Sequence, residues 1–179
     1  MLFKRMLRVA MFDNKVYGEM RGDPIAMTQA VLVLALVSFA TVAGAGLGAY
    51  LYSDTVSLEM KKAALIMPGL WFIQAASAYV FGSISMDAGN RKGTRRDLLT
   101  AIGYSTAPGV LFFFAFLIGT PGGFVAALLT LYMLATMIAA VKSVMDVSVF
   151  QALAAVTPGY LLRFLVVLLA DGPGPAGQA

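Results

Sequence analysis

The hydrophobic positions along the chain form five long apolar runs separated by short polar segments. A transmembrane helix needs about 20 mostly apolar residues to cross a hydrocarbon core of roughly 30 Å. Five stretches meet this length with at most one charged residue inside, and they cover residues 25–52, 63–86, 98–120, 122–141 and 147–170. The pattern therefore predicts an all-α polytopic membrane protein, a bundle of five transmembrane helices.

The segment before the first run is amphipathic. At helical spacing one face carries Phe3, Met6, Leu7, Ala10, Tyr17 and Met20, whereas Lys4, Arg5, Arg8 and Lys15 lie elsewhere. This arrangement is typical of a helix that lies in the membrane interface. A short helix packed under the bundle explains the same pattern. A break near Asp13-Asn14 and a turn at Gly22-Asp23-Pro24 are expected to separate this segment from the first run.

These boundaries divide the chain into three parts. Residues 1–23 form the cytoplasmic amphipathic segment, residues 24–170 the membrane domain, and residues 171–179 a Gly- and Pro-rich tail that is expected to be flexible. The charged stretch is long before the apolar residues begin, so no cleavable signal sequence is expected.

The basic residues are distributed unevenly over the two sides of the five-span arrangement. Ten of the thirteen Lys and Arg residues fall on one side, namely Lys4, Arg5, Arg8, Lys15, Arg21, Arg91, Lys92, Arg95, Arg96 and Lys142. The other side has Lys61 and Lys62, and Arg163 lies inside the last run. Short loops rich in Lys and Arg stay in the cytoplasm, so the N-terminus is predicted to be cytoplasmic and, after five crossings, the C-terminus outside.

Composition narrows the possible functions. The chain is 60% apolar and 12% charged, with a mean hydropathy of +0.83. The net charge of +4 resides in the predicted cytoplasmic segments, which favours anionic lipid headgroups over nucleic acid as a partner. The absence of Cys and His removes disulfides, thiol and imidazole chemistry and the usual zinc and haem ligands. We therefore expect no cofactor, no metal site and no enzymatic activity.

Proline and glycine mark sites of helix bending and close packing. Three runs contain a Pro-Gly step, beginning at Pro68, Pro108 and Pro158. Proline removes a backbone donor, so each step is expected to kink its helix, either as a fixed bend or as a hinge. Gly44 and Gly48 have GxxxG spacing, which allows close helix approach. Contact within the same chain is favoured there over dimerisation.

Arg163 is the one ionisable residue well inside a run, and an intramembrane charge is a functional hypothesis by default. It lies seven residues before the end of the run, about 10 Å at roughly 1.5 Å per residue, so its side chain can reach the interface. The preferred interpretation is an anchor for a phospholipid or a partner for an outer acidic residue, and the alternative is a substrate or ion site.

A second basic cluster lies between the second and third runs and comprises Arg91, Lys92, Arg95 and Arg96. The loop is rich in glycine but lacks the Gly-Lys-Ser/Thr ending of a P-loop, so nucleotide binding is not predicted. With Lys4, Arg5 and Arg8 the cluster is predicted to contact anionic lipids at about 1 kcal/mol per charge. The alternative is that these basic residues only set the membrane topology and have no lipid-binding role.

Several motifs resemble one known family. Gly93-Thr94-Arg95-Arg96, followed by Gly103-Tyr104-Ser105 and Pro108, is similar to the central signature of the Yip (Ypt/Rab-interacting protein) domain family. Arg8, Phe12 and Tyr17, the Asp23-Pro24 turn and Gln151-Ala152 resemble other family positions, so the likeness covers nearly the whole chain.

The resemblance implies five membrane helices with a cytoplasmic N-terminus, and it does not imply an enzyme. Eukaryotic members of this family act in vesicle trafficking and bind Rab-type GTPases, often through a longer soluble N-terminal region. Here 24 residues precede the first run, so GTPase binding is not carried over. The compact, cysteine-free chain is more similar to a bacterial member, which implies the inner membrane.

Two functions follow from these observations. The leading hypothesis is a non-enzymatic membrane protein that organises lipids or partner proteins, as a scaffold, a homo-oligomer or an accessory subunit of a membrane complex. The alternative is a small transporter, channel or lipid-translocating protein that uses the kinked helices and Arg163. Polar residues inside the runs, including Gln74, Ser77, Thr106 and Thr157, fit either a cavity lining or interhelical hydrogen bonds.

Overall fold

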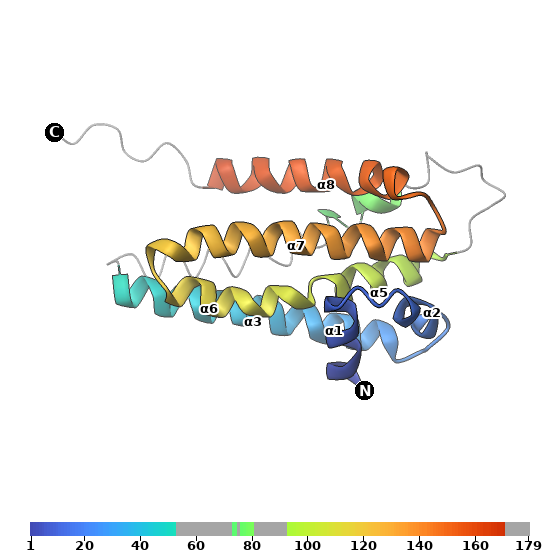
Figure 1. Ribbon diagram of the computed structural model, residues 1–179, viewed down its shortest axis with the longest axis horizontal. Helices are drawn as coiled ribbons and strands as arrows, with labels where there is room; N and C mark the ends of the chain where they lie inside the picture. The colour runs from blue at the N-terminus through green and yellow to red at the C-terminus, as the bar shows by residue number, and fades with distance from the viewer. Residues whose placement is uncertain (53–72, 75, 81–92, 171–179) are drawn as a thin grey trace.

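The computed structural model describes residues 1–52, 73–74, 76–80 and 93–170, and it describes only the backbone at 120, 163, 164 and 166–170. Every regular element in this part of the chain is helical (Figure 1). The elements are α1 (Leu2–Ala10), α2 (Lys15–Met20), α3 (Ala26–Tyr52), α5 (Arg95–Ser105), the 3₁₀ helix η1 (Ala107–Leu111), α6 (Phe112–Leu117), α7 (Thr120–Met145) and α8 (Val149–Ala170).

Three helical stretches are long and apolar enough to cross a membrane. They are α3, the composite Arg95–Leu117 and the part of α7 from Pro121 to Met145. Helix α8 has 22 residues, of which Val149–Leu162 form its described apolar part. Most of the predicted span 63–86 lies outside the described residues, although 73–74 and 76–80 are helical. The all-α class is therefore confirmed, and the count of five spans stays a prediction.

The predicted limits of the third run, 98–120, were wrong at both ends. The helix begins earlier because Thr94 forms a capping box with Asp97: the Thr94 hydroxyl accepts from the Asp97 N–H at 3.2 Å, and the Asp97 carboxylate accepts from the Thr94 N–H at 3.0 Å. It ends at Leu117, and Gly119, with φ of 66°, turns the chain into α7. Helix α7 in turn extends beyond the predicted end at 141, to Met145.

The third run is interrupted near Pro108. This proline lies in η1, and the Gly109 N–H bonds to the Thr106 carbonyl at 2.7 Å, three residues back. Because this 3₁₀ bond reaches only three residues back, the Gly109 N–H does not bond to the Ser105 carbonyl, its α-helical partner four residues back. The fully buried Thr136 of α7 donates its hydroxyl to that carbonyl at 2.8 Å. A neighbouring helix thus satisfies the backbone group that the break releases.

The helices pack side by side around the composite helix α5–η1–α6. Helix α3 lies along one side of it, α7 along another, and α8 packs on α7 (Figure 1). A Cβ at Gly44 would lie 2.7 Å from the Phe113 Cα, and one at Gly48 would lie 2.5 Å from the Phe116 carbonyl oxygen. The GxxxG pair of α3 therefore lies directly against the backbone of α6 in the same chain.

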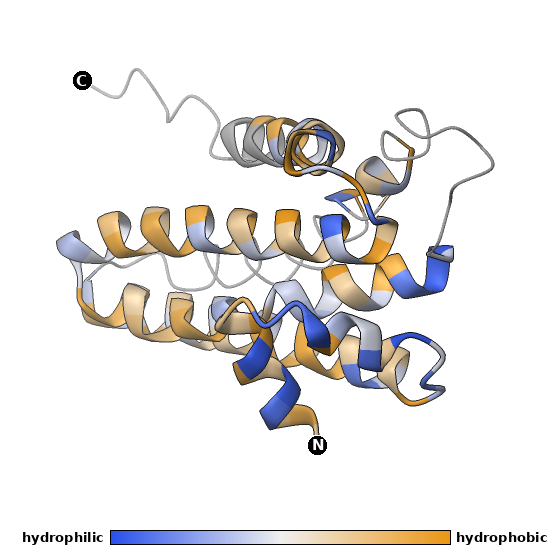
Figure 2. Ribbon diagram, turned by 45° about the vertical axis from the view of Figure 1, so that its right-hand side comes forward, coloured by the Kyte–Doolittle hydropathy of each residue, from blue (hydrophilic) through white to orange (hydrophobic). Residues whose placement is uncertain are grey.

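Residues 1–23, here called the N-terminal unit, fold against the side of the bundle as two short helices separated by a turn. Of the face predicted from the sequence, Met6, Tyr17 and Met20 are buried, whereas Phe3 and Leu7 are exposed. Val9 and Val16 were not part of the predicted face, and both are fully buried. The inner side of the unit is thus packed against the bundle, and an apolar outer side remains. Figure 2 shows polar residues gathered on and around this unit, while the remote lengths of α3, α6 and α7 are apolar.

Candidate interaction surface at the charged end

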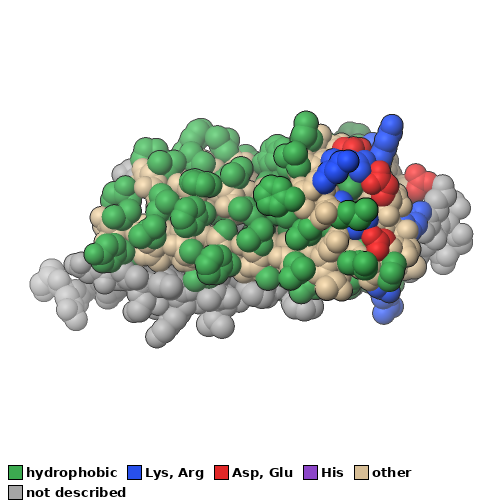
Figure 3. Space-filling model, turned by 90° about the horizontal axis from the view of Figure 1, so that it is seen from below, with side chains coloured by type: hydrophobic (Ala, Val, Ile, Leu, Met, Phe, Trp, Pro, Cys, Tyr) green, Lys and Arg blue, Asp and Glu red, His purple; other side chains and the backbone are tan. Residues whose placement is uncertain are grey.

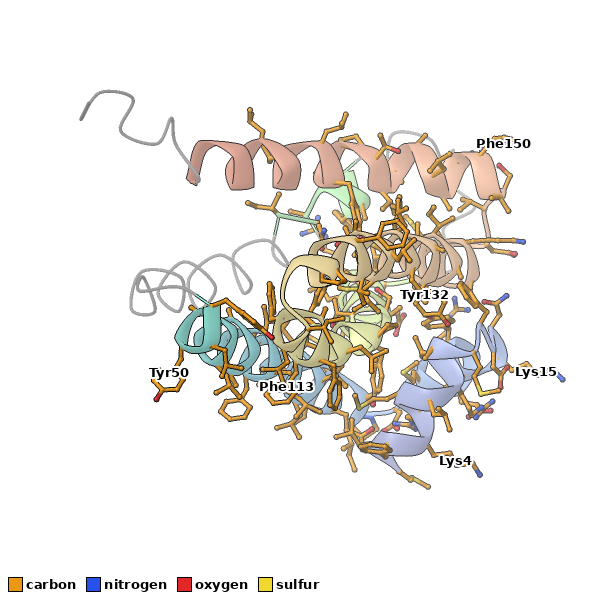
Figure 4. The ribbon with its side chains drawn as sticks, turned by 60° about the vertical axis from the view of Figure 1, so that its left-hand side comes forward. Lys4, Lys15, Tyr50, Phe113, Tyr132 and Phe150 are labelled. Carbon is orange, nitrogen blue, oxygen red and sulfur yellow. The ribbon has the colours of Figure 1, made fainter. Side chains whose placement is uncertain are left out.

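The charged side chains that the structure describes gather at one end of the molecule (Figure 3). They come from the N-terminal unit, the start of α5 and the end of α7, and we call this region the charged end. Its members are Lys4, Arg5, Arg8, Asp13, Lys15, Glu19, Arg21, Asp23, Arg95, Arg96, Asp97, Lys142 and Asp146. Helix α3 leads away from it to an exposed aromatic residue, Tyr50 (Figure 4).

Arg8 connects the two helices of the N-terminal unit. Its Nη1 and Nη2 contact the two carboxylate oxygens of Glu19 at 2.6 and 2.9 Å, and its Nε contacts Asp13 at 2.7 Å. Two-point pairing of this kind uses the fork geometry that only arginine offers. The Arg8 guanidinium lowers the pKa of both carboxyl groups, so both carry their charge at neutral pH.

Arg5 connects α1 to the bundle. Its Nη2 contacts the Asp23 carboxylate at 2.6 Å, and its Nη1 donates to the side-chain oxygen of Gln29 at 2.8 Å. The same Gln29 oxygen accepts from the hydroxyl of Tyr104, which is completely buried in α5, at 2.7 Å. Hydrogen bonds from the Ile25 N–H and from Arg5 lower the pKa of Asp23. The Gln29 side-chain oxygen therefore joins α1, α3 and α5, and the ionised Asp23 holds Arg5 beside it.

The predicted lipid contacts differ in their availability. Arg5 and Arg8 are held by carboxylates of the same chain, whereas Lys4 is exposed and points away from the bundle (Figure 4). Lys15 and Lys142 are exposed as well.

The basic residues around α5 also have contacts inside the chain. The Arg95 guanidinium lies 4.7 Å from the centre of the Tyr79 ring, a cation–π distance. Arg96 donates to the Pro24 carbonyl at 3.0 Å, and Arg21 donates to the Val144 carbonyl at 2.7 Å. Arg91 and Lys92 lie outside the described residues.

A small pocket opens between α2 and α5 at the charged end. Its lining residues are Tyr17, Met20, Arg21, Asp97, Thr100 and Ala101, and its volume is about 170 Å³ including the part open to solvent. Arg21 donates to Val144, and Asp97 caps α5, so the two charged groups of the pocket are already engaged. The pocket is therefore a small gap where the N-terminal unit packs on α5.

The remaining predicted site residues lie away from the charged end or outside the description. Pro158 lies inside α8, where the helix continues through it, and Pro68 lies outside the described residues. Arg163 belongs to α8, but its side chain is outside the description, so its role stays a prediction.

Gln74 and Ser77 pack closely against α8 beside Pro158. The Gln74 Nε2 and the Ser77 Oγ are buried and have no hydrogen-bond partner among the residues that the structure describes, and a Cβ at Gly159 would lie 3.1 Å from the Ser77 Cβ. The other two polar residues singled out by sequence bond within their own helical stretches, Thr106 to the Gly103 carbonyl and Thr157 to the Leu153 carbonyl.

Sequence reasoning missed the acidic partners of the arginines and the Gln29–Tyr104 bond. Asp13, Glu19 and Asp23 are separated from their arginines by 5 to 18 positions, and no short spacing rule detects such pairs. The capping box was detectable, because Thr94 and Asp97 match the Ser/Thr-x-x-Asp/Glu pattern at a helix start.

The motif residues that resemble the Yip signature have packing roles at this end. A Cβ at Gly93 would lie 2.7 Å from Val144, and one at Gly103 would lie 2.9 Å from the Ala30 Cβ. Thr94 caps α5, and Tyr104 is buried in the Arg5 network. The motif thus occupies the contacts of α5 with α3 and α7.

Within the described residues, no group of three or more His, Cys, Asp or Glu side chains is placed to hold a metal ion. No protein-family model, curated protein or solved structure matches the chain. The Yip resemblance therefore rests on the sequence motifs alone.

Proposed function

We propose that this chain is a non-enzymatic integral membrane protein that organises lipids or partner proteins through its charged end at the cytoplasmic surface of a bacterial inner membrane. The proposal includes five crossings. These place Arg91 and Lys92 on the cytoplasmic side and the tail at 171–179 on the outer side. The observation that carries it is the segregation of charge: the described charged side chains gather at one end of a bundle whose helices are otherwise apolar (Figure 3).

The geometry supports a binding surface that is both rigid and basic. Arg5 and Arg8 hold the N-terminal unit in place, and three lysines, Lys4, Lys15 and Lys142, are left exposed around it. Each basic residue close to an anionic leaflet contributes about 1 kcal/mol of attraction, roughly a fivefold change in local lipid population. We infer that these lysines enrich anionic lipids around the protein.

The test is extraction of the protein from its native membrane in lipid nanodiscs, followed by mass spectrometry of the lipids and proteins that accompany it. A variant with Lys4→Gln, Lys15→Gln and Lys142→Gln is compared with Lys61→Gln/Lys62→Gln, which removes charge from the predicted outer side. We expect the first variant to lose anionic-lipid enrichment several-fold and the second to retain it.

The outcomes distinguish a lipid-organising role of the charged end from a protein-docking role. A stoichiometric protein partner that the triple variant loses would make the charged end a protein-docking surface. Equal lipid content in the two variants, with no protein partner in either, would contradict an organising role for this end.

One observation favours the transport alternative. Gln74 and Ser77 present buried polar atoms next to Gly159, beside the Pro158 step of α8, and these atoms have no partner in the described part of the chain. Such groups are costly in an apolar interior unless a bound molecule or water satisfies them. We would measure lipid scrambling and ion flux in proteoliposomes; flux that Gln74→Leu abolishes would move transport to first place.

A further inference from the structure

Helix α1 has a direction unlike that of the long helices. Its axis is steeply inclined to those of α3 and α7, which run along the length of the bundle (Figure 1). Its inner residues Met6 and Val9 are buried, and it packs on α5 and η1. If the long helices cross a membrane as proposed above, α1 lies in the plane of that membrane.

The outer side of α1 carries an apolar stripe. Phe3, Leu7 and Met11 follow one another at a spacing of four, which places them along one line of the helix and the turn that ends it. Their exposed fractions are 78%, 59% and 71%. Three large apolar side chains in one row, on a helix already packed through another face, indicate a surface that is covered by an apolar environment.

One flank of this stripe and the end of its helix have different surroundings. At 100° per residue Arg8 lies on the flank toward Lys4, and there it pairs with Glu19 of α2, on the side of the charged end. At the C-terminal end of α1 the Tyr132 hydroxyl donates to the Ala10 carbonyl, and the Phe12 ring meets the Tyr132 ring edge-on at 5.3 Å (Figure 4). The stripe therefore lies between a charged region and the outer surface of α7.

The surface of α7 beyond Tyr132 is apolar and exposed. Leu128 and Leu131 are 49% and 61% exposed, and α3 presents Leu36 and Phe39 in the same way. A membrane-crossing bundle turns such residues toward lipid. The stripe on α1 thus meets a lipid-facing surface at the end of the helix and is bordered by charge along one flank, which is the polarity profile of the headgroup boundary.

We propose that the stripe Phe3–Leu7–Met11 inserts into the cytoplasmic leaflet at the boundary between headgroups and acyl chains, with Lys4 beside the lipid phosphates. The occupant of this face is the lipid leaflet. Because α1 is fixed to the bundle by Arg5, Met6 and Val9, the insertion sets the depth at which the bundle sits in the membrane. This inference rests on the proposed membrane crossing and adds a surface that the charge distribution alone does not assign.

The chain contains no cysteine, so single-cysteine variants can each carry one nitroxide label. Labels at Phe3→Cys, Leu7→Cys and Met11→Cys are placed in nanodiscs of phosphatidylethanolamine and phosphatidylglycerol at one protein per disc. Phe39→Cys on α3, with Phe39 72% exposed, is the lipid-facing control, and Lys15→Cys on α2 is the water-facing control. Collision rates with oxygen, which concentrates among acyl chains, and with a water-soluble nickel chelate are measured by electron paramagnetic resonance.

We expect the oxygen-to-nickel ratio at positions 3, 7 and 11 to be several-fold above that at Lys15→Cys and to approach that at Phe39→Cys. A ratio equal to that of Lys15→Cys would overturn the insertion. Shielding from both reagents and spin–spin broadening that appear only in a second preparation with two copies per disc would assign the stripe to a second copy of the chain instead. A water-like ratio at Phe39→Cys would contradict the membrane crossing itself, so failure of that proposal is distinguishable from failure of the insertion.

Discussion

Gly44 and Gly48 show how single residues determine a close contact between two helices, α3 and α6. Neither position has a positive φ, so glycine is not required there by backbone conformation. It is required by space, because the backbone of α6 occupies the volume that a methyl group would need. Removing the side chain lets two backbones approach, and this increases the dispersion contacts that hold apolar helices together in lipid.

The substitution Gly48→Ala should therefore destabilise the protein. The added Cβ would lie 2.5 Å from the Phe116 carbonyl oxygen, so α3 and α6 must separate, at a cost of about 1–3 kcal/mol. The measurement is thermal unfolding in detergent micelles or nanodiscs.

Gly123→Ala is the matched control for this substitution. A Cβ at Gly123 meets nothing within 4 Å in α7, so that variant should keep or slightly raise the melting temperature. Equal melting temperatures for the two variants would show that the close approach is not required.

The arginines and lysines of the charged end have different surroundings. Arg5 and Arg8 make several directed bonds to carboxylate and amide groups, which the planar guanidinium favours. Lys4, Lys15 and Lys142 are exposed, and an ammonium on a flexible stem suits a fluid array of phosphates. Sequence reasoning grouped Arg5 and Arg8 with Lys4 because charge alone does not reveal which cation has an intramolecular partner.

At the scale of elements, the N-terminal unit is held by both apolar contacts and ion pairs. Val9 and Val16 are fully buried, and Arg5 and Arg8 bind three carboxylates. The long helices depend on apolar packing in their described parts, so the unit is the element whose attachment responds to pH.

Acidification should loosen this unit before it affects α3. The pKa values of Asp13, Glu19 and Asp23 are lowered in the folded protein. Groups with depressed pKa values stabilise the fold above their unfolded values, about 4, and this contribution is lost as the pH falls through the folded values below that. Hydrogen exchange at pH 7, 5 and 3.5, corrected for the intrinsic rate, should show loss of protection in residues 2–20 only at the lowest pH.

Two controls accompany the acid experiment. Peptides from α3 serve as the internal reference, because that helix contains no charged residue. The variant Arg8→Gln should have weaker protection in residues 2–20 at pH 7 and a smaller further loss on acidification. Unchanged protection of the unit at pH 3.5 would show that apolar contacts alone hold it.

At the scale of the whole molecule, the charged end and the exposed aromatic end of α3 are separated by 27 helical residues, about 40 Å at 1.5 Å per residue. This length covers a hydrocarbon core and part of both interfaces. The positive-inside rule then makes the orientation a testable property of the entire chain.

Lys15→Cys should react with a membrane-impermeant maleimide only after the membrane is opened, and Tyr50→Cys should react in intact spheroplasts. A label at the C-terminus should behave like Tyr50→Cys if the chain crosses five times. Reaction of the C-terminal label only in opened membranes, together with Lys15→Cys, would make the number of crossings even.

The sequence by itself determined the helical class and the presence of membrane-length apolar helices, because both follow from local periodicity and run length, which need no knowledge of neighbours. It also located the break at Pro108, where a missing donor acts within one turn.

Only the tertiary structure decided which residues distant in sequence contact one another. It assigned Arg5 and Arg8 to carboxylates of the same chain, and it divided the apolar positions of α1 into a buried pair and an exposed stripe. It also placed Thr136 against the carbonyl that the break releases. Each of these depends on which residues distant in sequence approach one another, and a linear pattern of hydrophobic and polar positions carries no information about that approach.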